Sequence, residues 1–142
     1  MSHHADLKPL DPASLDAARS TMPSDDQLQW IVEAAEALAD PTRIRILSAL
    51  ARRALTVRDL AILVGVSESA VSHQLRFLRD RRVVKRRRHG TTMFYTVDDQ
   101  HVAALIREAE YHADHVSRGL PDHIPYSPSD EVPGTEAEGD AP

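Results

Sequence analysis

Two helical patterns separated by a glycine turn constrain the possible folds of this chain more than any other feature of its sequence. Residues 56–65 (TVRDLAILVG) begin with a threonine suited to an N-cap and end with a helix-terminating glycine. Residues 66–82 (VSESAVSHQLRFLRDRR) open with a capping serine and place Val71, Leu75 and Leu78 on one face of a second helix. This spacing predicts a helix-turn-helix.

The sequence changes to β periodicity directly after these helices. In residues 83–97 (VVKRRRHGTTMFYTV), β-branched and aromatic residues flank RRHG, which predicts two strands joined by a tight turn at His89 and Gly90. A helix-turn-helix with an adjoining hairpin is a winged helix-turn-helix. In that fold the second helix enters the major groove of double-stranded DNA, and the hairpin touches the flanking backbone.

Helical periodicity is present on both sides of this unit. Residues 25–40 and 41–53 precede it, and the proline at position 41 separates the two patterns. Residues 98–115 (DDQHVAALIREAEYHADH) follow it. The predicted fold class is therefore mainly α with a β-hairpin, in the order helix, helix, helix-turn-helix, hairpin, helix.

The chain is long enough for one domain and two tails. With 142 residues, 42% of them hydrophobic, it can bury one modest core. Residues 1–26 and 121–142 are rich in proline, small and acidic residues and are predicted to be disordered. Residues 27–120 should form the winged helix-turn-helix domain.

Charge is segregated along the chain. Residues 41–90 contain thirteen Arg or Lys against three Asp or Glu, a net charge of +10, whereas the remaining residues have four against nineteen, or −15. A basic centre of this kind indicates binding to a polyanion. The candidate base or phosphate contacts on the second helix are Glu68, Ser69, Ser72, His73 and Arg76. Arg86, Arg87 and Arg88 on the wing should contact phosphates.

The last helical pattern contains three histidines, His101, His112 and His115, near its two ends. At about 100° per residue, His112 lies ~20° from His101 around the helix and His115 lies about 40° to the other side. The first two are nevertheless ~16 Å apart along the axis, whereas metal–nitrogen bonds are only ~2 Å long. One helix therefore cannot close a metal site, but two copies packed antiparallel can, which predicts a homodimer through the terminal helices.

Each such site would combine Asp99 and His101 of one subunit with His112 and His115 of the other. In a continuous helix Asp99 would lie ~160° from His101, so it must occupy the helix N-terminus. Asp98, three residues before His101, is the alternative carboxylate ligand on grounds of helix geometry. The chain has no cysteine, so any metal must bind through nitrogen and oxygen.

Four stretches taken in order, LADPTRIRIL, VSESAVSHQLRFLRD, RRHGTTMFY and DDQHVAALIREAEYHADH, resemble the ArsR/SmtB family of metal-responsive repressors. The resemblance covers about residues 27–118. It implies a homodimeric winged helix protein that binds operator DNA without metal and releases it when metal binds. The family's D-x-H and H-x-x-H pattern matches Asp99, His101, His112 and His115, and favours Asp99 over Asp98.

The residue types limit the choice of metal. Family members that sense arsenite, cadmium or lead often use a C-V-C motif, and this chain has Thr56, Val57 and Arg58 there. Imidazoles and a carboxylate suit Zn(II), Co(II) and Ni(II). Four ligands predict tetrahedral zinc. Additional ligands from His3, His4 or His123 would favour six-coordinate nickel or cobalt, although Ser117 stands where such a sensor can have another histidine.

Other functions remain as alternatives. The same fold could answer a different signal, or act as an activator, with structural histidines. A metal enzyme lacks support, because no nucleophile with an orienting partner and a substrate pocket accompanies the histidines. No apolar run approaches the ~20 residues that span a bilayer, and the N-terminal residues are polar and acidic. The sequence therefore predicts a cytoplasmic protein that does not contact membranes.

Overall fold

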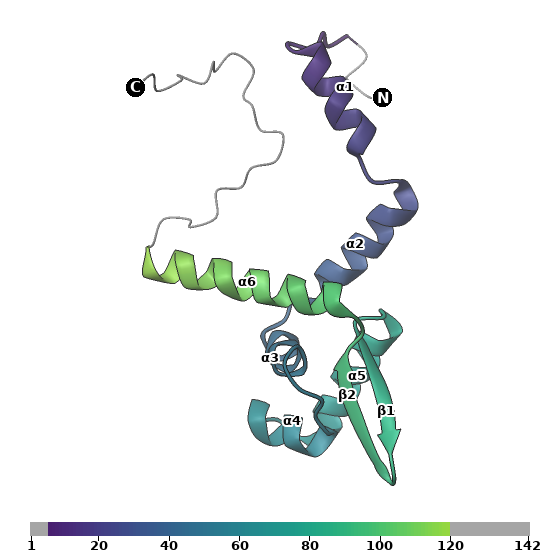
Figure 1. Cartoon of the computed structure of the whole chain (residues 1–142), viewed down its shortest axis with the longest axis vertical. Helices are drawn as coiled ribbons and strands as arrows, with labels where there is room; N and C mark the ends of the chain where they lie inside the picture. The colour runs from purple at the N-terminus through teal and green to yellow at the C-terminus, as the bar shows by residue number, and fades with distance from the viewer. Residues whose placement is uncertain (1–5, 120–142) are drawn as a thin grey trace, which may run out of the picture. The chain divides into compact units, whose positions relative to one another are not determined.

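The structure is a computed structural model that describes residues 6–119 (Figure 1). The predicted tail 121–142 and the candidate ligands His3, His4 and His123 lie outside these residues. The helices and strands of the structure are, in chain order, α1 (Pro12–Thr21), α2 (Asp25–Ala37), α3 (Pro41–Leu50), α4 (Val57–Val64), α5 (Glu68–Asp80), β1 (Val84–His89), β2 (Thr92–Val97) and α6 (Gln100–Arg118). The chain divides into two compact units, and the boundary falls inside α6, after Arg107.

The predicted helix-turn-helix consists of α4 and α5, each with a local start signal. The Thr56 hydroxyl accepts a hydrogen bond from the Asp59 N–H at 3.2 Å, and the Ser67 hydroxyl accepts one from the Ala70 N–H at 3.0 Å. Gly65 ends α4 in the left-handed region, with φ of 79°, which glycine adopts without steric cost. These caps fix the turn between the two helices.

The hydrophobic core lies among α3, α4, α5, the base of the hairpin and the start of α6. Val71, Leu75 and Leu78 are buried on α5, as the spacing predicts. They pack with Ile46, Leu47, Leu50, Leu60, Val83, Val84, Tyr95 and Ile106. Burying a side chain of this size contributes about 1.5–3 kcal/mol, so this cluster holds the helix-turn-helix against the hairpin.

The wing is an antiparallel hairpin in which Val84 pairs with Val97 and His89 pairs with Thr92. Gly90 has a φ of 63° at the first position of the two-residue loop, where hairpin turns need a positive angle. The tight turn predicted at His89 and Gly90 is thus present one residue later, at Gly90 and Thr91. An isolated bridge also joins Leu55, before α4, to Tyr95, through hydrogen bonds of 3.1 and 2.8 Å. This bridge ties the base of the wing to the helix-turn-helix.

The N-terminal segment differs from the sequence prediction. Residues 12–21 form α1 instead of a disordered stretch, because Asp11 accepts a hydrogen bond from the Ser14 N–H at 3.1 Å and Pro12 fits the first helical turn. α2 starts at Asp25 with a capping box between Ser24 and Gln27. α1 buries none of its residues, so only local signals support it.

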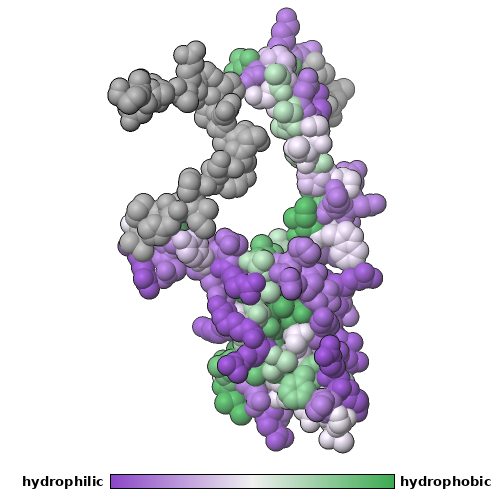
Figure 2. All heavy atoms as spheres, viewed as in Figure 1, coloured by the Kyte–Doolittle hydropathy of each residue, from purple (hydrophilic) through white to green (hydrophobic). Residues whose placement is uncertain are grey.

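The apolar side chains of α2 are largely unburied. Leu28, Ile31 and Val32 are 40%, 53% and 53% exposed, respectively. Hydrophobic surface is visible over part of α2 and of α4 in the space-filling view (Figure 2). A face of this kind is typical of a surface that another chain covers.

α5 ends in a Schellman motif. The Val83 N–H donates to the Leu78 carbonyl at 2.9 Å and the Arg82 N–H to the Arg79 carbonyl at 3.0 Å. Arg82 has a φ of 56°, a left-handed conformation that glycine usually supplies at this position.

Within residues 6–119, none of the helices has the length and apolar character needed to cross a bilayer.

Candidate DNA-binding and metal-binding sites

The candidate DNA-contacting residues share the outer surface of α5. Its apolar face is buried, which leaves Glu68, Ser69, Ser72, His73 and Arg76 exposed, as the spacing predicts. These side chains occupy the first nine residues of the helix. In a helix-turn-helix, the N-terminal residues of the second helix are the ones that reach base edges.

Arg58 on α4 belongs to the same surface, although it is not among the contacts predicted from the sequence. Its guanidinium lies 3.7 Å from the Glu68 carboxylate, and both side chains are exposed. This pair balances the one acidic residue among the candidate contacts and leaves a polar surface that a polyanion can approach. The sequence feature that could have identified Arg58 is its positive charge in the first turn of the first helix of the helix-turn-helix.

The basic residues of the wing extend into solvent. Lys85 and the three arginines that follow it are exposed along β1, whereas Val84 at its base is buried. A groove of about 1130 Å³ lies between the hairpin and the start of α6, and its lining includes Lys85, Arg87, Arg107, Asp98 and Asp99. The start of α6, which has candidate metal ligands, is therefore adjacent to the wing.

Asp99 is the N-cap of α6. Its Oδ1 accepts a hydrogen bond from the Val102 N–H at 3.0 Å, which places it outside regular helix geometry. The hydrogen bond from Val102 lowers the pKa of Asp99, with smaller contributions from the His101 N–H and the His101 charge. The carboxylate is thus in the ionised form that binds cations. Its Oδ1 is also 3.7 Å from Nδ1 of His101, whose side chain is 98% exposed.

Asp98 occupies a different environment. It is half-buried, and its backbone N–H donates to the Val83 carbonyl at 2.9 Å, which ties the end of β2 to the segment after α5. Its side chain also lines the groove beside the wing. Both acids thus remain at the start of α6, but only Asp99 lies within 4 Å of His101 among the residues described.

The two histidines at the other end of α6 differ in exposure. His112 is exposed, whereas His115 is 5% exposed and its ring lies against that of Tyr111, tilted by 47° with the ring centroids 4.1 Å apart. Of the three histidines that the spacing predicts on one face of the helix, His115 is thus the buried one. His115 and Tyr111 meet because residues four apart are neighbours on a helix surface.

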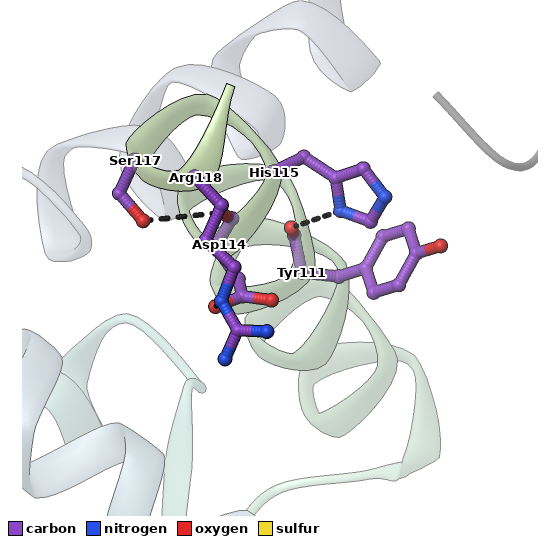
Figure 3. A network of polar contacts seen from close by, with 5 residues as sticks. All are labelled: Tyr111, Asp114, His115, Ser117 and Arg118. Carbon is purple, nitrogen blue, oxygen red and sulfur yellow. Dashed lines mark hydrogen bonds and ion pairs between the residues drawn. The ribbon is translucent and has the colours of Figure 1, made fainter. Parts of the chain in front are cut away.

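Nδ1 of His115 lies 3.0 Å from the Tyr111 carbonyl oxygen (Figure 3). A carbonyl can only accept, so in the neutral ring the proton is on Nδ1 and the lone pair is on Nε2. Histidines that bind metals through one ring nitrogen commonly donate a hydrogen bond from the other to a carbonyl in this way.

The same end of α6 has two further polar contacts. Arg118 pairs with Asp114 at 2.9 Å, and the Ser117 hydroxyl donates to the Asp114 carbonyl at 3.0 Å.

The structure does not bring the proposed ligands together in one chain. Among residues 6–119, no three His, Asp or Glu side chains are close enough to hold a metal ion. The pair formed by Asp99 and His101 starts α6, and His112 and His115 come eleven or more residues later in the same helix. At ~1.5 Å per residue this is about 16 Å, so a shared site requires a second chain.

Comparisons with known proteins agree with the fold. Residues 40–86 match the family described as bacterial regulatory protein, arsR family. The chain is 55% identical over 87 residues to a transcriptional repressor SmtB homolog of Synechocystis sp., covering 61% of this chain and 66% of that protein. It is 43% identical over 108 residues to the HTH-type transcriptional regulator NmtR of Mycobacterium tuberculosis, covering 75% of this chain and 90% of that protein.

Among solved structures, the chain resembles the homodimeric winged helix-turn-helix DNA-binding domain of Mb0332 from Mycobacterium bovis. The TM-score is 0.64 at 27% sequence identity, and the match covers 73% of this chain and 99% of that chain. This likeness confirms the winged helix-turn-helix fold predicted from the sequence.

Proposed function

Because this chain belongs to the arsR family of bacterial regulatory proteins, we propose that it is a metal-responsive transcriptional repressor that acts as a homodimer on operator DNA. The relative named as a repressor and the structural neighbour described as a homodimeric DNA-binding domain support this reading. The DNA-binding and metal-sensing residues would both lie in residues 27–120.

The observation that carries the metal proposal is the donor set of α6. Asp99, an ionised N-cap carboxylate, lies beside the exposed His101, and two more histidines lie at the opposite end of the helix. These are nitrogen and oxygen donors of the kind that suit Zn(II), Ni(II) and Co(II). In an antiparallel pair of α6 helices, Asp99 and His101 of one chain would meet His112 and His115 of the other.

Exposed apolar side chains on α2 and α6 support such a dimer. Leu28, Ile31 and Val32 on α2 are at least 40% exposed, and so are Leu105 and Val116 on α6. A bound divalent cation would supply positive charge and directional bonds at the interface between the two chains. On this proposal, the protein's own task is to hold its α6 helices in the geometry that gathers the four donors.

The response to metal follows from linkage. If the dimer geometry that gathers the donors differs from the geometry that fits DNA, metal and DNA weaken each other's binding by the same factor. Typical couplings correspond to about 5- to 150-fold. In this proposal α5 makes the base contacts, and Arg86, Arg87 and Arg88 add phosphate contacts that give affinity without sequence preference.

A binding titration tests this function. A duplex selected by the metal-free protein from a random library is used, and its affinity is measured by fluorescence anisotropy at fixed ionic strength. Adding Zn(II), Co(II) or Ni(II) should weaken binding by about 5- to 150-fold. Binding that none of the three metals changes would reject the metal response, and failure to select any duplex would reject DNA recognition.

The Co(II) complex distinguishes the metals. A four-ligand tetrahedral site gives intense visible absorption and favours zinc, whereas weak octahedral bands favour nickel or cobalt with extra ligands. His3, His4 and His123 are the proposed extra ligands. Octahedral bands that survive their replacement by alanine would exclude these three residues.

A second candidate function is a winged-helix regulator, either a repressor or an activator, whose histidines are structural. The burial of His115 against Tyr111 is the observation that favours it. Under this alternative, replacing His112 by alanine would leave metal affinity unchanged. Under the proposed function it would lower that affinity strongly.

A further inference from the structure

We propose that Phe77 on α5, together with Arg43 and Arg81, couples α2 to the DNA-reading helix and transmits part of the metal response. This inference rests on the proposed function, because it concerns how a change at the dimer helices reaches α5. Phe77 is a positioning residue here. It is half-buried and is not among the exposed candidate contacts on α5.

Arg43 attaches this group to α2. It lies in the first turn of α3, where its backbone N–H bonds to the Asp40 carboxylate at 3.0 Å. Its side chain turns back, and Nε donates to the Ala37 carbonyl at 3.0 Å while Nη2 donates to the Glu36 carbonyl at 2.9 Å. The last carbonyls of a helix lack intrahelical partners and form the negative end of its dipole. α2 has no basic residue in its own last turn, so Arg43 provides that cation from α3.

The same guanidinium lies over the ring of Phe77, with Cζ 4.4 Å from the ring centroid. Arg81, the C-cap residue directly after α5, places its Cζ 3.5 Å from that centroid, and its Nη1 donates to the Phe77 carbonyl at 3.3 Å. A cation over an aromatic face is attracted by the ring quadrupole. Nε of Arg81 is buried and makes no hydrogen bond among residues 6–119, so the ring is a main partner of this guanidinium.

α2 also reaches the end of α5 at a second point. The Arg82 guanidinium lies 5.5 Å from the centroid of the Trp30 ring, and Arg82 is in the left-handed turn that ends α5. The C-terminal end of α2, through Arg43, and its middle, through Trp30, therefore both contact the C-terminal end of α5. Leu28, Ile31 and Val32 on the same helix are open to a second chain.

This arrangement predicts how α2 and α5 move together. Arg43 follows the carbonyls that it binds, and Phe77 follows the guanidinium that lies over its ring. A shift of α2 at the dimer interface would thus change the tilt of α5, although neither Arg43 nor Phe77 touches DNA or metal in the proposal. Residues of this kind alter coupling between sites and leave the sites themselves intact.

The test compares four variants of the full chain: Phe77→Leu, Phe77→Tyr, Arg43→Lys and Arg45→Lys. Phe77→Leu removes the aromatic face, and Arg43→Lys keeps the charge but loses the paired carbonyl bonds. Phe77→Tyr retains the ring. Arg45→Lys is the matched control, because Arg45 is an exposed arginine on the same helix.

Three quantities are measured for each variant. They are the metal affinity without DNA, the affinity for the selected duplex without metal, and the ratio of duplex affinities without and with metal. The metal is whichever of Zn(II), Co(II) and Ni(II) gives the largest wild-type ratio. We expect Phe77→Leu and Arg43→Lys to reduce that ratio by about 2- to 30-fold while metal affinity stays within about twofold. Phe77→Tyr and Arg45→Lys should keep the wild-type ratio.

A wild-type ratio in both Phe77→Leu and Arg43→Lys would overturn the inference and leave the proposed function standing. A loss of metal affinity that matches the lower ratio would also overturn it, because the residues would then act on the metal site. If Phe77→Leu does not fold, Arg43→Lys against Arg45→Lys decides. A wild-type protein that ignores all three metals would instead remove the proposed function, and this inference with it.

Discussion

Asp99 has two roles in the proposed protein, and a single substitution can separate them. Asparagine caps a helix about as well as aspartate, so Asp99→Asn should keep the hydrogen bond from Val102 and the stability of α6. It removes the anionic oxygen donor. Metal affinity should therefore fall by about tenfold or more, measured by competition with a chelator of known affinity.

Asp98→Asn is the control for that experiment, because it changes the neighbouring carboxyl group, which lies in the groove beside the wing. Metal affinity should stay near that of the wild type. The reverse result, with Asp98→Asn harmful and Asp99→Asn harmless, would assign the ligand to Asp98.

The lowered pKa of Asp99 also makes the free energy of unfolding depend on pH. Its contribution to stability is present above the unfolded-state pKa and is lost as pH falls through the folded-state pKa.

Arg82 is held in a backbone conformation that disfavours residues with a Cβ. Its φ of 56° stands at the position after α5 where glycine is usual. Arg82→Gly should therefore raise the free energy of unfolding by about 1 kcal/mol, as measured by urea denaturation at fixed protein concentration.

The comparison is Gln74→Gly, in the middle of α5, which should lower the free energy of unfolding by about 0.5 kcal/mol. If Arg82→Gly were also destabilising, the contact between Arg82 and Trp30 would outweigh the backbone strain.

At the scale of elements, the wing is a source of affinity that does not depend on sequence. Replacing Arg86, Arg87 and Arg88 by alanine should weaken binding to selected and random duplexes alike. The slope of log affinity against log salt should become shallower by about 0.9 for each phosphate that the protein no longer neutralises. Arg19→Ala, an exposed arginine on α1, should leave that slope unchanged. Weaker binding to the selected duplex alone would mean that the wing reads bases.

The elements predicted most closely from the sequence are those with local signals. The caps at Thr56 and Ser67 and the glycines at 65 and 90 act within a few residues, so α4, α5 and the hairpin could be predicted with nearly their observed ends. The cap formed by Asp11 and Pro12 is just as local. It was missed because α1 has no apolar stripe that packs on the core.

Features set by tertiary contacts could not be predicted in this way. Leu55 lies in a segment without periodicity, so its bridge to Tyr95 depends on how the hairpin folds back. The group formed by Arg43, Phe77 and Arg81 joins three helices, and no spacing in the sequence indicates it. For the candidate metal site, spacing predicted the N-terminal position of Asp99 but not the ring contact between His115 and Tyr111.

At the scale of the whole molecule, the proposed site predicts complementation between chains. His101→Ala and His112→Ala each change an exposed histidine, and each homodimer would lack one ligand in both sites. In a mixed dimer, one site regains all four ligands and the other lacks two. An equimolar, exchanged mixture should therefore recover about a quarter of the wild-type Co(II) capacity, since about half of its dimers are mixed.

The control is each variant exchanged with itself, which should recover nothing. A mixture that binds no more Co(II) than the separate variants would show that His101 of one chain and His112 of the other do not share a site. Such a result would contradict the antiparallel arrangement of α6 and leave the winged helix-turn-helix fold unaffected.

The uncovered side chains of α2 have one more consequence. Leu28, Ile31 and Val32 remain in contact with water unless a second chain arrives, so association and folding stability are linked by mass action. Diluting the protein should therefore lower its melting temperature. The abundance of the chain would then become an input of its own: a scarce regulator would be mostly unpaired and silent, whatever the supply of metal.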